Sequence, residues 1–165
     1  MGLSIALLTI SDTRSLADDS SGDQLQRSLE AADHRLQERQ LCPDDRYQIR
    51  RELSRWIADP AVDVMITSGG TGLTGRDGTP EAVVPLLDKT IEGFGELFRV
   101  LSFESIGTST LQSRCLAGVA NGTFVFVLPG SLDAVTTAWN RLIRAQLDAG
   151  TRPCNLAQLR ARLKE

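Results

Sequence analysis

The chain has 165 residues, of which 41% are hydrophobic and 24% charged, so its composition is that of an ordinary globular protein and its length suits one domain over residues 1–165. The net charge is −3 and there is no basic run, which excludes a nucleic-acid-binding surface and a basic membrane anchor. An anionic ligand would therefore need local help from backbone N–H groups, an arginine or a metal ion.

The cysteines and the amino-terminal segment bear on the cellular compartment. Cys42, Cys115 and Cys154 lie far apart, and His34 is the only histidine. This argues against a disulfide framework and a zinc site, and it favours a reducing compartment. The apolar run at residues 3–10 is too short to cross a bilayer and has no basic leader, so we expect a cytoplasmic protein with no membrane partner.

The first predicted elements are a strand and a helix. Residues 3–10 form a near-continuous apolar run, typical of a strand buried on both faces. After a polar loop, Ser21 and Gln24 form a capping-box pattern that predicts a helix start. Apolar residues follow at helical spacing, at Leu25, Leu29, Ala32 and Leu36.

A second strand, a second helix and a third strand follow. Residues 35–41 predict a weak, polar strand suited to a sheet edge. Pro43-Asp44-Asp45 predicts the start of a helix. Residues 62–67 predict the next buried strand.

The second half of the chain continues the alternation. Thr79-Pro80-Glu81 combines a capping hydroxyl, a proline at the first helical position and an acid in the first turn, which predicts a helix start. Asn121-Gly122 turns the chain into a buried strand at residues 123–128, and a helix follows residues 129–131. Two helical segments lie between, marked by Phe94, Leu97, Phe98 and Leu101 and by Leu111 and Cys115. The alternation predicts an α/β fold with a largely parallel sheet covered on both faces.

Ligands of such sheets bind at the carboxyl ends of the strands, where one loop is rich in glycine. Residues 68–75 read Ser-Gly-Gly-Thr-Gly-Leu-Thr-Gly, so backbone N–H groups and hydroxyls could cradle phosphate there. The alternative is an ordinary turn. Gly70–Gly75 matches G-x-G-x-x-G, but four residues intervene before the helix at Pro80, which disfavours a dinucleotide-binding oxidoreductase.

Two carboxylates near this loop suggest a metal. A carboxylate beside a phosphate repels it unless a cation lies between them, and Mg²⁺ takes one or two carboxylates together with phosphate oxygens. Asp77 lies within the loop, and Asp44 lies at the second helix start. The alternatives are structural, with Asp44 as a helix cap and Asp77 as a partner of Arg76.

Several segments together resemble the MoaB and MogA family of molybdenum cofactor biosynthesis proteins. Residues 67–72, followed by Arg76-Asp77-Gly78-Thr79-Pro80-Glu81, are similar to the family signature. Ser11-Asp12, residues 19–22, Pro43-Asp44-Asp45 and residues 128–131 extend the resemblance over nearly the whole chain. Residues 92–96, 109–114 and 151–155 resemble the MoaB branch most.

The resemblance implies a three-layer α/β/α sandwich that binds molybdopterin and assembles as a homo-oligomer, a trimer or a hexamer. Catalytic members adenylylate molybdopterin with ATP and Mg²⁺, and Asp77 and Asp44 stand at the positions of the catalytic carboxylates, acting through the metal. The phosphate- and molybdopterin-binding residues that the resemblance implies are Ser68, Gly69, Gly70, Thr71, Gly72, Ser11, Asp12, Pro129, Gly130 and Ser131.

Two functions stay open at this point. The first is a molybdopterin adenylyltransferase, and the second is a non-catalytic module that binds or carries molybdopterin. Leu132 stands where many adenylylating members have a second proline, whereas both acids are present, which favours the enzyme. Two interpretations, a subunit contact and core packing, are open for Phe94, Leu97, Phe98 and Leu101.

Overall fold

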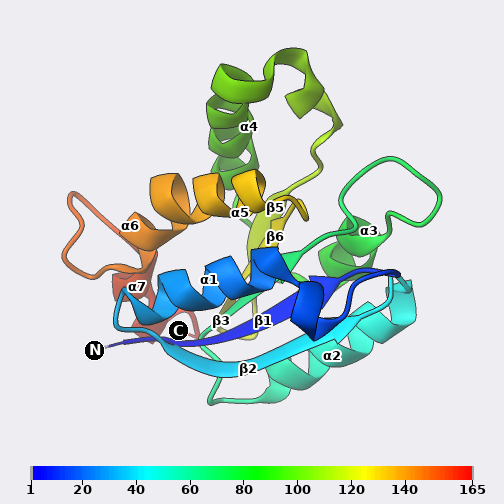
Figure 1. Ribbon diagram of the computed structural model, residues 1–165. Helices are drawn as coiled ribbons and strands as arrows, with labels where there is room; N and C mark the ends of the chain where they lie inside the picture. Colours follow the sequence, from blue (N-terminus) through cyan, green and yellow to red (C-terminus); the bar gives the residue numbers. More distant parts are fainter. Residues whose placement is uncertain (1, 165) are drawn as a thin grey trace.

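A computed structural model describes residues 2–164, and its centre is one six-stranded sheet (Figure 1). The strands are β1 (Ser4–Ile10), β2 (Arg35–Cys42), β3 (Val64–Ser68), β4 (Lys89–Thr90), β5 (Leu116–Ala120) and β6 (Thr123–Leu128). Their order in the sheet is β2-β1-β3-β6-β5-β4. The first four in this order are parallel, and β5 and β4 join antiparallel. The α/β fold with a mostly parallel sheet is therefore confirmed, including the edge position of β2.

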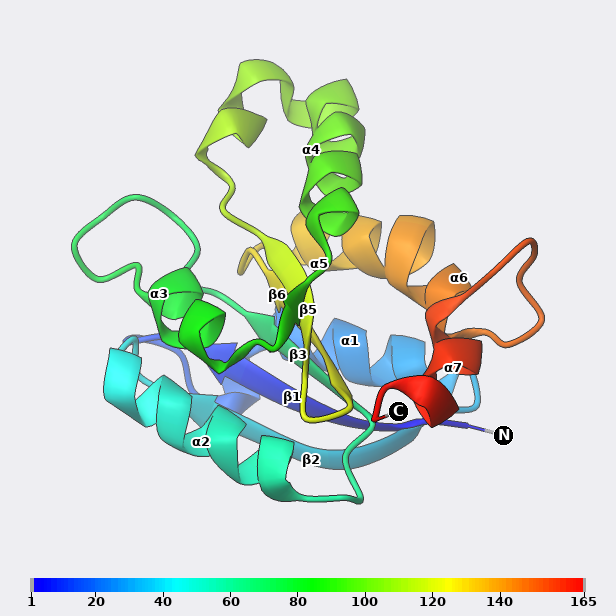
Figure 2. The same cartoon turned by 180° about the vertical axis from the view of Figure 1, so that it is seen from behind.

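Helices cover both faces of the sheet, giving three layers (Figures 1 and 2). The helices are α1 (Ser20–Glu30), α2 (Arg46–Ala58), α3 (Thr79–Val83), α4 (Glu92–Ile106), α5 (Leu132–Ala138), α6 (Arg144–Leu147) and α7 (Leu156–Leu159). A π-helical turn, Trp139–Ile143, joins α5 to α6. One apolar core lies between the sheet and α1, α4 and α5, and a second lies between the sheet and α2 and α3.

The alternation of side chains along β1 shows how the two cores share one sheet. Ile5 and Leu7 pack in the first core, and Ala6 and Leu8 pack in the second. All four side chains are almost fully buried, because successive residues of a strand point to opposite faces. This confirms the prediction of a strand buried on both faces.

Three predicted details are wrong. Asp19, not Ser21, caps α1, because its carboxylate accepts a hydrogen bond from the Gly22 N–H at 3.0 Å. The helix ends at Glu30, and Leu36 lies in β2. Cys115 is buried outside any helix, next to β5, a strand that the sequence pattern did not reveal.

The segment containing α4 stands away from the sheet (Figures 1 and 2). We call residues 92–114 the arm; they comprise α4, the 3-10 turn Gly107–Gln112 and the return toward β5. Phe94 and Phe98 join the first core, whereas Leu97 is 55% exposed. No helix within residues 2–164 combines the length and the apolar character that a membrane crossing requires.

Candidate functional site

The candidate site lies at the carboxyl ends of the parallel strands. β1, β3 and β6 are adjacent and parallel, so the loops that follow Ile10, Ser68 and Leu128 emerge at one edge of the sheet. In Figures 1 and 2 the loop after β3 projects on the opposite side of the molecule from both termini. The glycine loop, the loop with Ser11 and Asp12 and the loop at residues 129–131 therefore lie at the same edge of the sheet.

The glycine loop has a backbone that only glycine adopts easily. Gly69 and Gly70 have φ values of 107° and 65°, in the region that side chains disfavour. Gly69 also approaches the loop after β6, since a methyl group on Gly130 would stand 3.2 Å from the Gly69 Cα. The hydroxyl of Thr79 donates to the Gly69 carbonyl at 3.0 Å, closing the loop onto α3. Thr79 was predicted to cap α3, but Gly78 occupies the cap position and the hydroxyl serves the loop instead.

Asp44 faces the glycine loop and does not cap α2. The carboxylate of its neighbour Asp45 accepts the capping bonds, from the Tyr47 and Gln48 N–H groups. The Oδ1 of Asp44 accepts a bond from the Gly78 N–H at 3.2 Å. Its Oδ2 would lie 2.6 Å from a methyl group on Gly70, so the carboxylate occupies the space that this glycine leaves open.

Asp77 is held within the loop itself. Its Oδ2 accepts hydrogen bonds from the Thr74 N–H at 2.9 Å and the Thr74 hydroxyl at 2.6 Å. The same oxygen would lie 2.7 Å from a methyl group on Gly72. Arg76, the alternative partner of Asp77, instead forms a two-bond ion pair with Asp12, at 2.8 and 2.9 Å.

The two carboxylates have pKa values that diverge from the ordinary range in opposite directions. Partial burial raises the pKa of Asp44, and the nearby negative charges of Asp77 and Asp12 raise it further. The Thr74 hydroxyl bond lowers the pKa of Asp77. Asp44 is therefore a carboxylate whose charge is poorly compensated, and a bound cation would stabilise its ionised form.

A pocket of 420 Å³ lies between the glycine loop and the arm. Gly69, Gly70, Thr71, Gly72 and Asp77 form one wall, and Pro129, Gly130 and Ser131 form another. The arm supplies a polar wall that the sequence did not predict, made by Ser102, Ser105, Ser109, Thr110, Gln112 and Ser113. The pocket is large enough for part of a nucleotide or a pterin, and Phe98 and Ile106 add apolar surface to the hydrogen-bonding groups of its lining.

Four predicted site residues do not line this pocket: Asp44, Ser68, Ser11 and Asp12. Ser68 is 2% exposed within β3. The hydroxyl of Ser11 accepts bonds from the Thr13 and Arg14 N–H groups, which shapes the loop after β1. Besides its pair with Arg76, Asp12 accepts a bond from the Asp44 N–H at 3.0 Å. Asp12 thus braces Asp44 and Arg76 rather than lining the cavity.

Arg114, at the end of the arm, reaches back to the glycine loop. Its Nε donates to the Gly72 carbonyl at 2.8 Å and its Nη2 to the Asp77 carbonyl at 2.9 Å, while Nη1 pairs with Glu81. Arg114 belongs to a segment that resembles the MoaB branch, but no local pattern predicts a contact 37 residues away in the chain.

The described residues suit a magnesium ion that substrate phosphates help to hold. No group of three or more His, Cys, Asp or Glu side chains forms a metal cluster within residues 2–164. A Mg²⁺ ion bound through one or two carboxylates and phosphate oxygens needs no such cluster. Asp44 beside Gly70 and Asp77 beside Gly72 would supply the carboxylate oxygens for such an ion, and a cation would offset the burial and repulsion that raise the pKa of Asp44.

A larger hollow of 540 Å³ lies at the amino ends of the strands, lined by Leu3, Val62 and the carboxyl-terminal segment. Its buried carboxylate, Asp63, is already paired with Arg160 and accepts a bond from the Ser4 N–H. It has no glycine cradle and no unsatisfied carboxylate. The chemistry therefore places the candidate site in the smaller pocket.

Comparison with known proteins identifies relatives from molybdenum cofactor biosynthesis. A family model described as "Probable molybdopterin binding domain" matches residues 6–149. Molybdenum cofactor biosynthesis protein B of Escherichia coli K12 is 54% identical over 151 residues, which is 92% of this chain and 89% of that protein.

Two solved structures are similar throughout. A crystal structure of a molybdenum cofactor biosynthesis protein B superposes with a TM-score of 0.86 and 42% identity, covering 89% of this chain and 92% of the other. The tungsten cofactor synthesizing protein MoaB of Pyrococcus furiosus gives a TM-score of 0.77 and 34% identity, covering 86% and 90%. Sequence and fold thus point to the same relatives.

Proposed function

The chain belongs to the family of molybdopterin-binding domains of molybdenum cofactor biosynthesis, and on this premise we propose that it adenylylates molybdopterin with Mg-ATP. The observation that carries the proposal is the pair of carboxylates at the glycine loop. Asp77 lies beside Gly72 and lines the 420 Å³ pocket, and Asp44 lies beside Gly70, a glycine of the same wall. A site for molybdopterin alone would gain nothing from two acids that repel its phosphate.

The proposed reaction is the transfer of an adenylyl group. The terminal phosphate oxygen of molybdopterin attacks the α-phosphate of ATP, a new P–O bond forms, the bond to the β-phosphate breaks, and pyrophosphate leaves. Positioning and electrostatics carry reactions of this class. The N–H groups of Gly70–Gly72 hold a phosphate, and the loop after β6 lines the opposite side of the pocket.

The proposed magnesium ligands are Asp44 and Asp77. When bound, Mg²⁺ neutralises phosphate charge so that two anionic substrates can approach each other. The protein's own part is to hold both carboxylates in place. The Thr74 bonds hold Asp77, and the Gly78 N–H and the Asp12 brace hold the segment of Asp44.

A direct assay distinguishes the enzyme from the carrier. Purified protein is incubated with molybdopterin, ATP and Mg²⁺, and the products are separated by chromatography and identified by mass. The proposal expects adenylylated molybdopterin and one pyrophosphate per adenylyl group. Binding of molybdopterin with no such product would support the carrier function instead.

We also propose that the protein is a homo-oligomer, a trimer or a hexamer, whose subunits meet through the arm. Five large apolar side chains of the arm are 55–79% exposed: Leu97, Val100, Phe103, Ile106 and Leu111. Exposed apolar surface gathered on one projecting element is typical of a protein–protein contact. A second copy is the proposed occupant, because the arm would then be covered in every subunit.

A further inference from the structure

We propose that Arg114 is a positioning residue that orients both carboxylates of the site by binding the carbonyl groups of Gly72 and Asp77. The inference rests on the proposed function for its catalytic consequence, but its structural part can be measured independently. Arg114 lies at the end of the arm, 37 residues from Asp77 along the chain, and its guanidinium reaches the carbonyl groups of Gly72 and Asp77. Its side chain is 29% exposed, so its charge is partly shielded from water.

The first step is the peptide group between Asp77 and Gly78. Its carbonyl accepts a hydrogen bond from Arg114 Nη2 at 2.9 Å, and its N–H donates to Asp44 Oδ1 at 3.2 Å. In a trans peptide the C=O and N–H groups lie in one plane and point in opposite directions. Fixing the carbonyl therefore fixes the direction of the N–H that holds Asp44.

The second step concerns Asp77. Arg114 Nε also binds the Gly72 carbonyl, at 2.8 Å, and a methyl group on Gly72 would lie 2.7 Å from the Asp77 carboxylate. The guanidinium thus binds both ends of the loop segment 72–77, which begins at Gly72 and ends at Asp77. A planar fork makes both bonds in one geometry, whereas an ammonium group is a single point donor.

The third step is the anchor of the guanidinium itself. Glu81, in the first turn of α3, pairs with Arg114 Nη1. This ion pair leaves the other two nitrogens aimed at the loop carbonyls. Arg114 therefore acts on the backbone and is not a free cation available to substrate phosphates.

The structural test measures the hydrogen-exchange rate of the Gly78 amide by NMR. The proteins compared are Arg114→Met, Arg114→Lys and the wild type. We expect the Gly78 amide to exchange roughly tenfold faster in Arg114→Met, since loss of the carbonyl partner frees the peptide. Arg114→Lys should be intermediate. The matched control is Arg99→Met, which removes another arginine of the arm that binds the Ser113 and Cys115 carbonyls. Unchanged Gly78 exchange in a folded Arg114→Met protein would overturn the proposal.

The functional test separates positioning from simple attraction of phosphate. Calorimetry with ATP, in Mg²⁺ and in chelator, should show that Arg114→Met loses the magnesium-dependent part of ATP affinity and keeps the chelator value. Equal losses in both conditions, restored fully by Arg114→Lys, would show that only its charge matters and would overturn positioning. A wild type with no transferase activity would refute the proposed function, and the Gly78 exchange would still decide the role of Arg114.

Discussion

Asp44 and Asp45 are neighbours with separate tasks, which makes them a matched pair for mutation. Asp45 caps α2 through two backbone N–H groups, and Asp44 faces the glycine loop. Loss of a helix cap lowers the free energy of unfolding, whereas loss of a metal ligand lowers turnover. The two positions therefore separate a structural carboxylate from a functional one.

We expect Asp77→Asn and Asp44→Asn each to lower the kcat of adenylylation by about 100-fold or more, since each removes a proposed magnesium ligand. Both amides keep an acceptor oxygen, for Thr74 and Gly78 respectively, so the fold is retained. Because burial, and then repulsion from Asp77 and Asp12, raise the pKa of Asp44, its amide should leave thermal stability unchanged or slightly higher.

The control for this pair is Asp45→Ala, which should lower the free energy of unfolding by about 1 kcal/mol and leave turnover intact. Steady-state kinetics and thermal melting measure both quantities. Wild-type turnover in Asp77→Asn, or destabilised but active Asp44→Asn, would show that these carboxylates are structural.

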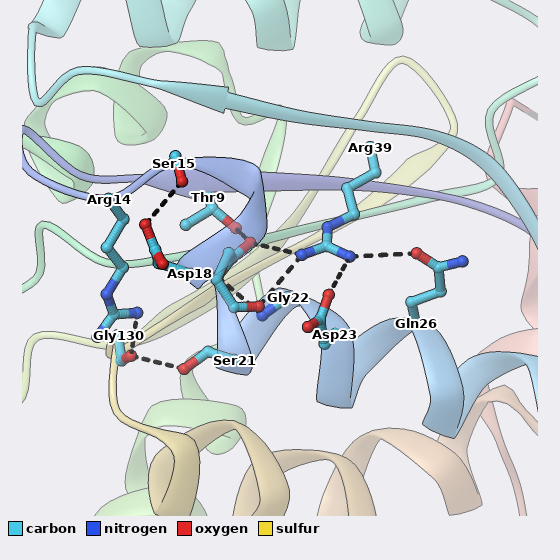
Figure 3. Close-up of polar contacts among 11 residues, drawn as sticks. Thr9, Arg14, Ser15, Asp18, Ser21, Gly22, Asp23, Gln26, Arg39 and Gly130 are labelled. Carbon is cyan, nitrogen blue, oxygen red and sulfur yellow. Dashed lines mark hydrogen bonds and ion pairs between the residues drawn. The ribbon is translucent and has the colours of Figure 1, made fainter.

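At the scale of elements, a buried ion pair fixes α1 to the sheet (Figure 3). Asp19 is fully buried and accepts bonds from the Thr9 hydroxyl at 2.6 Å and from Arg39 Nη2 at 2.9 Å. Burial opposes ionisation of Asp19, but these bonds outweigh it and lower its pKa. The same helix holds the loop after β6, because the Ser21 hydroxyl donates to the Gly130 carbonyl at 2.8 Å.

Arg39→Met should lower the free energy of unfolding by about 3–5 kcal/mol, because it leaves the Asp19 charge buried without its partner. Adding Asp19→Asn to this variant should recover part of the loss, since the amide carries no charge. Denaturant unfolding measures both variants. A loss below about 1 kcal/mol in Arg39→Met would mean that water or Thr9 suffices to compensate Asp19.

A second ion pair joins the edge strand β2 to α2 and gives stability a dependence on pH. Arg55 lowers the pKa of Glu38 to about 2 from 4.5, against partial burial and with help from the Trp56 N–H at 2.7 Å. The pKa of Glu38 is depressed in the folded state. Its ion pair with Arg55 therefore contributes fully to the free energy of unfolding above pH 4.5, and this contribution is lost as pH falls toward about 2.

Glu38→Gln should therefore lower stability at neutral pH by about 1 kcal/mol, after allowance for solvent screening, and should flatten the acid limb of the stability curve. The glutamine oxygen can still accept the Trp56 bond, so the change isolates the charge. Urea unfolding at several pH values measures the slope. Parallel curves for the two proteins would show that Glu38 does not titrate as described.

Sequence patterns predicted the elements that local chemistry determines and missed those that distant contacts determine. The apolar run of β1 predicted a strand buried on both faces, and the glycine loop predicted a bend before α3. By contrast, β4 has two residues and β5 reads Leu-Ala-Gly-Val-Ala, which has weak strand propensity and depends on pairing with β6.

The candidate site likewise has residues that the sequence predicts and contacts that it does not. Asp44 and Asp77 are identified by residue type beside a glycine loop. The bonds of Arg76 to Asp12 and of Arg114 to Asp77 join residues 64 and 37 positions apart, and no spacing rule predicts them. Asp44 and Asp45 are equally good caps by sequence, and only the position of the glycine loop distinguishes them.

At the scale of the whole molecule, the arm is the surface on which assembly can be tested. Phe103 is 57% exposed and makes no part of either core. Phe103→Asp should convert an oligomer into monomers, because a charge would be desolvated in the contact, with the far-ultraviolet circular dichroism unchanged. Light scattering at micromolar concentration measures the mass. A monomeric wild type would remove the assembly proposal.

The central claim is that two carboxylates serve a phosphate-binding loop through a metal ion, and ATP calorimetry with Mg²⁺ or with chelator tests it most directly. The protein is acidic overall, with a net charge of −3, so general attraction cannot supply affinity for ATP. We predict binding at least tenfold tighter with Mg²⁺, a preference that Asp77→Asn abolishes; tenfold corresponds to about 1.4 kcal/mol. Equal ATP affinity with Mg²⁺ and with chelator would contradict the account.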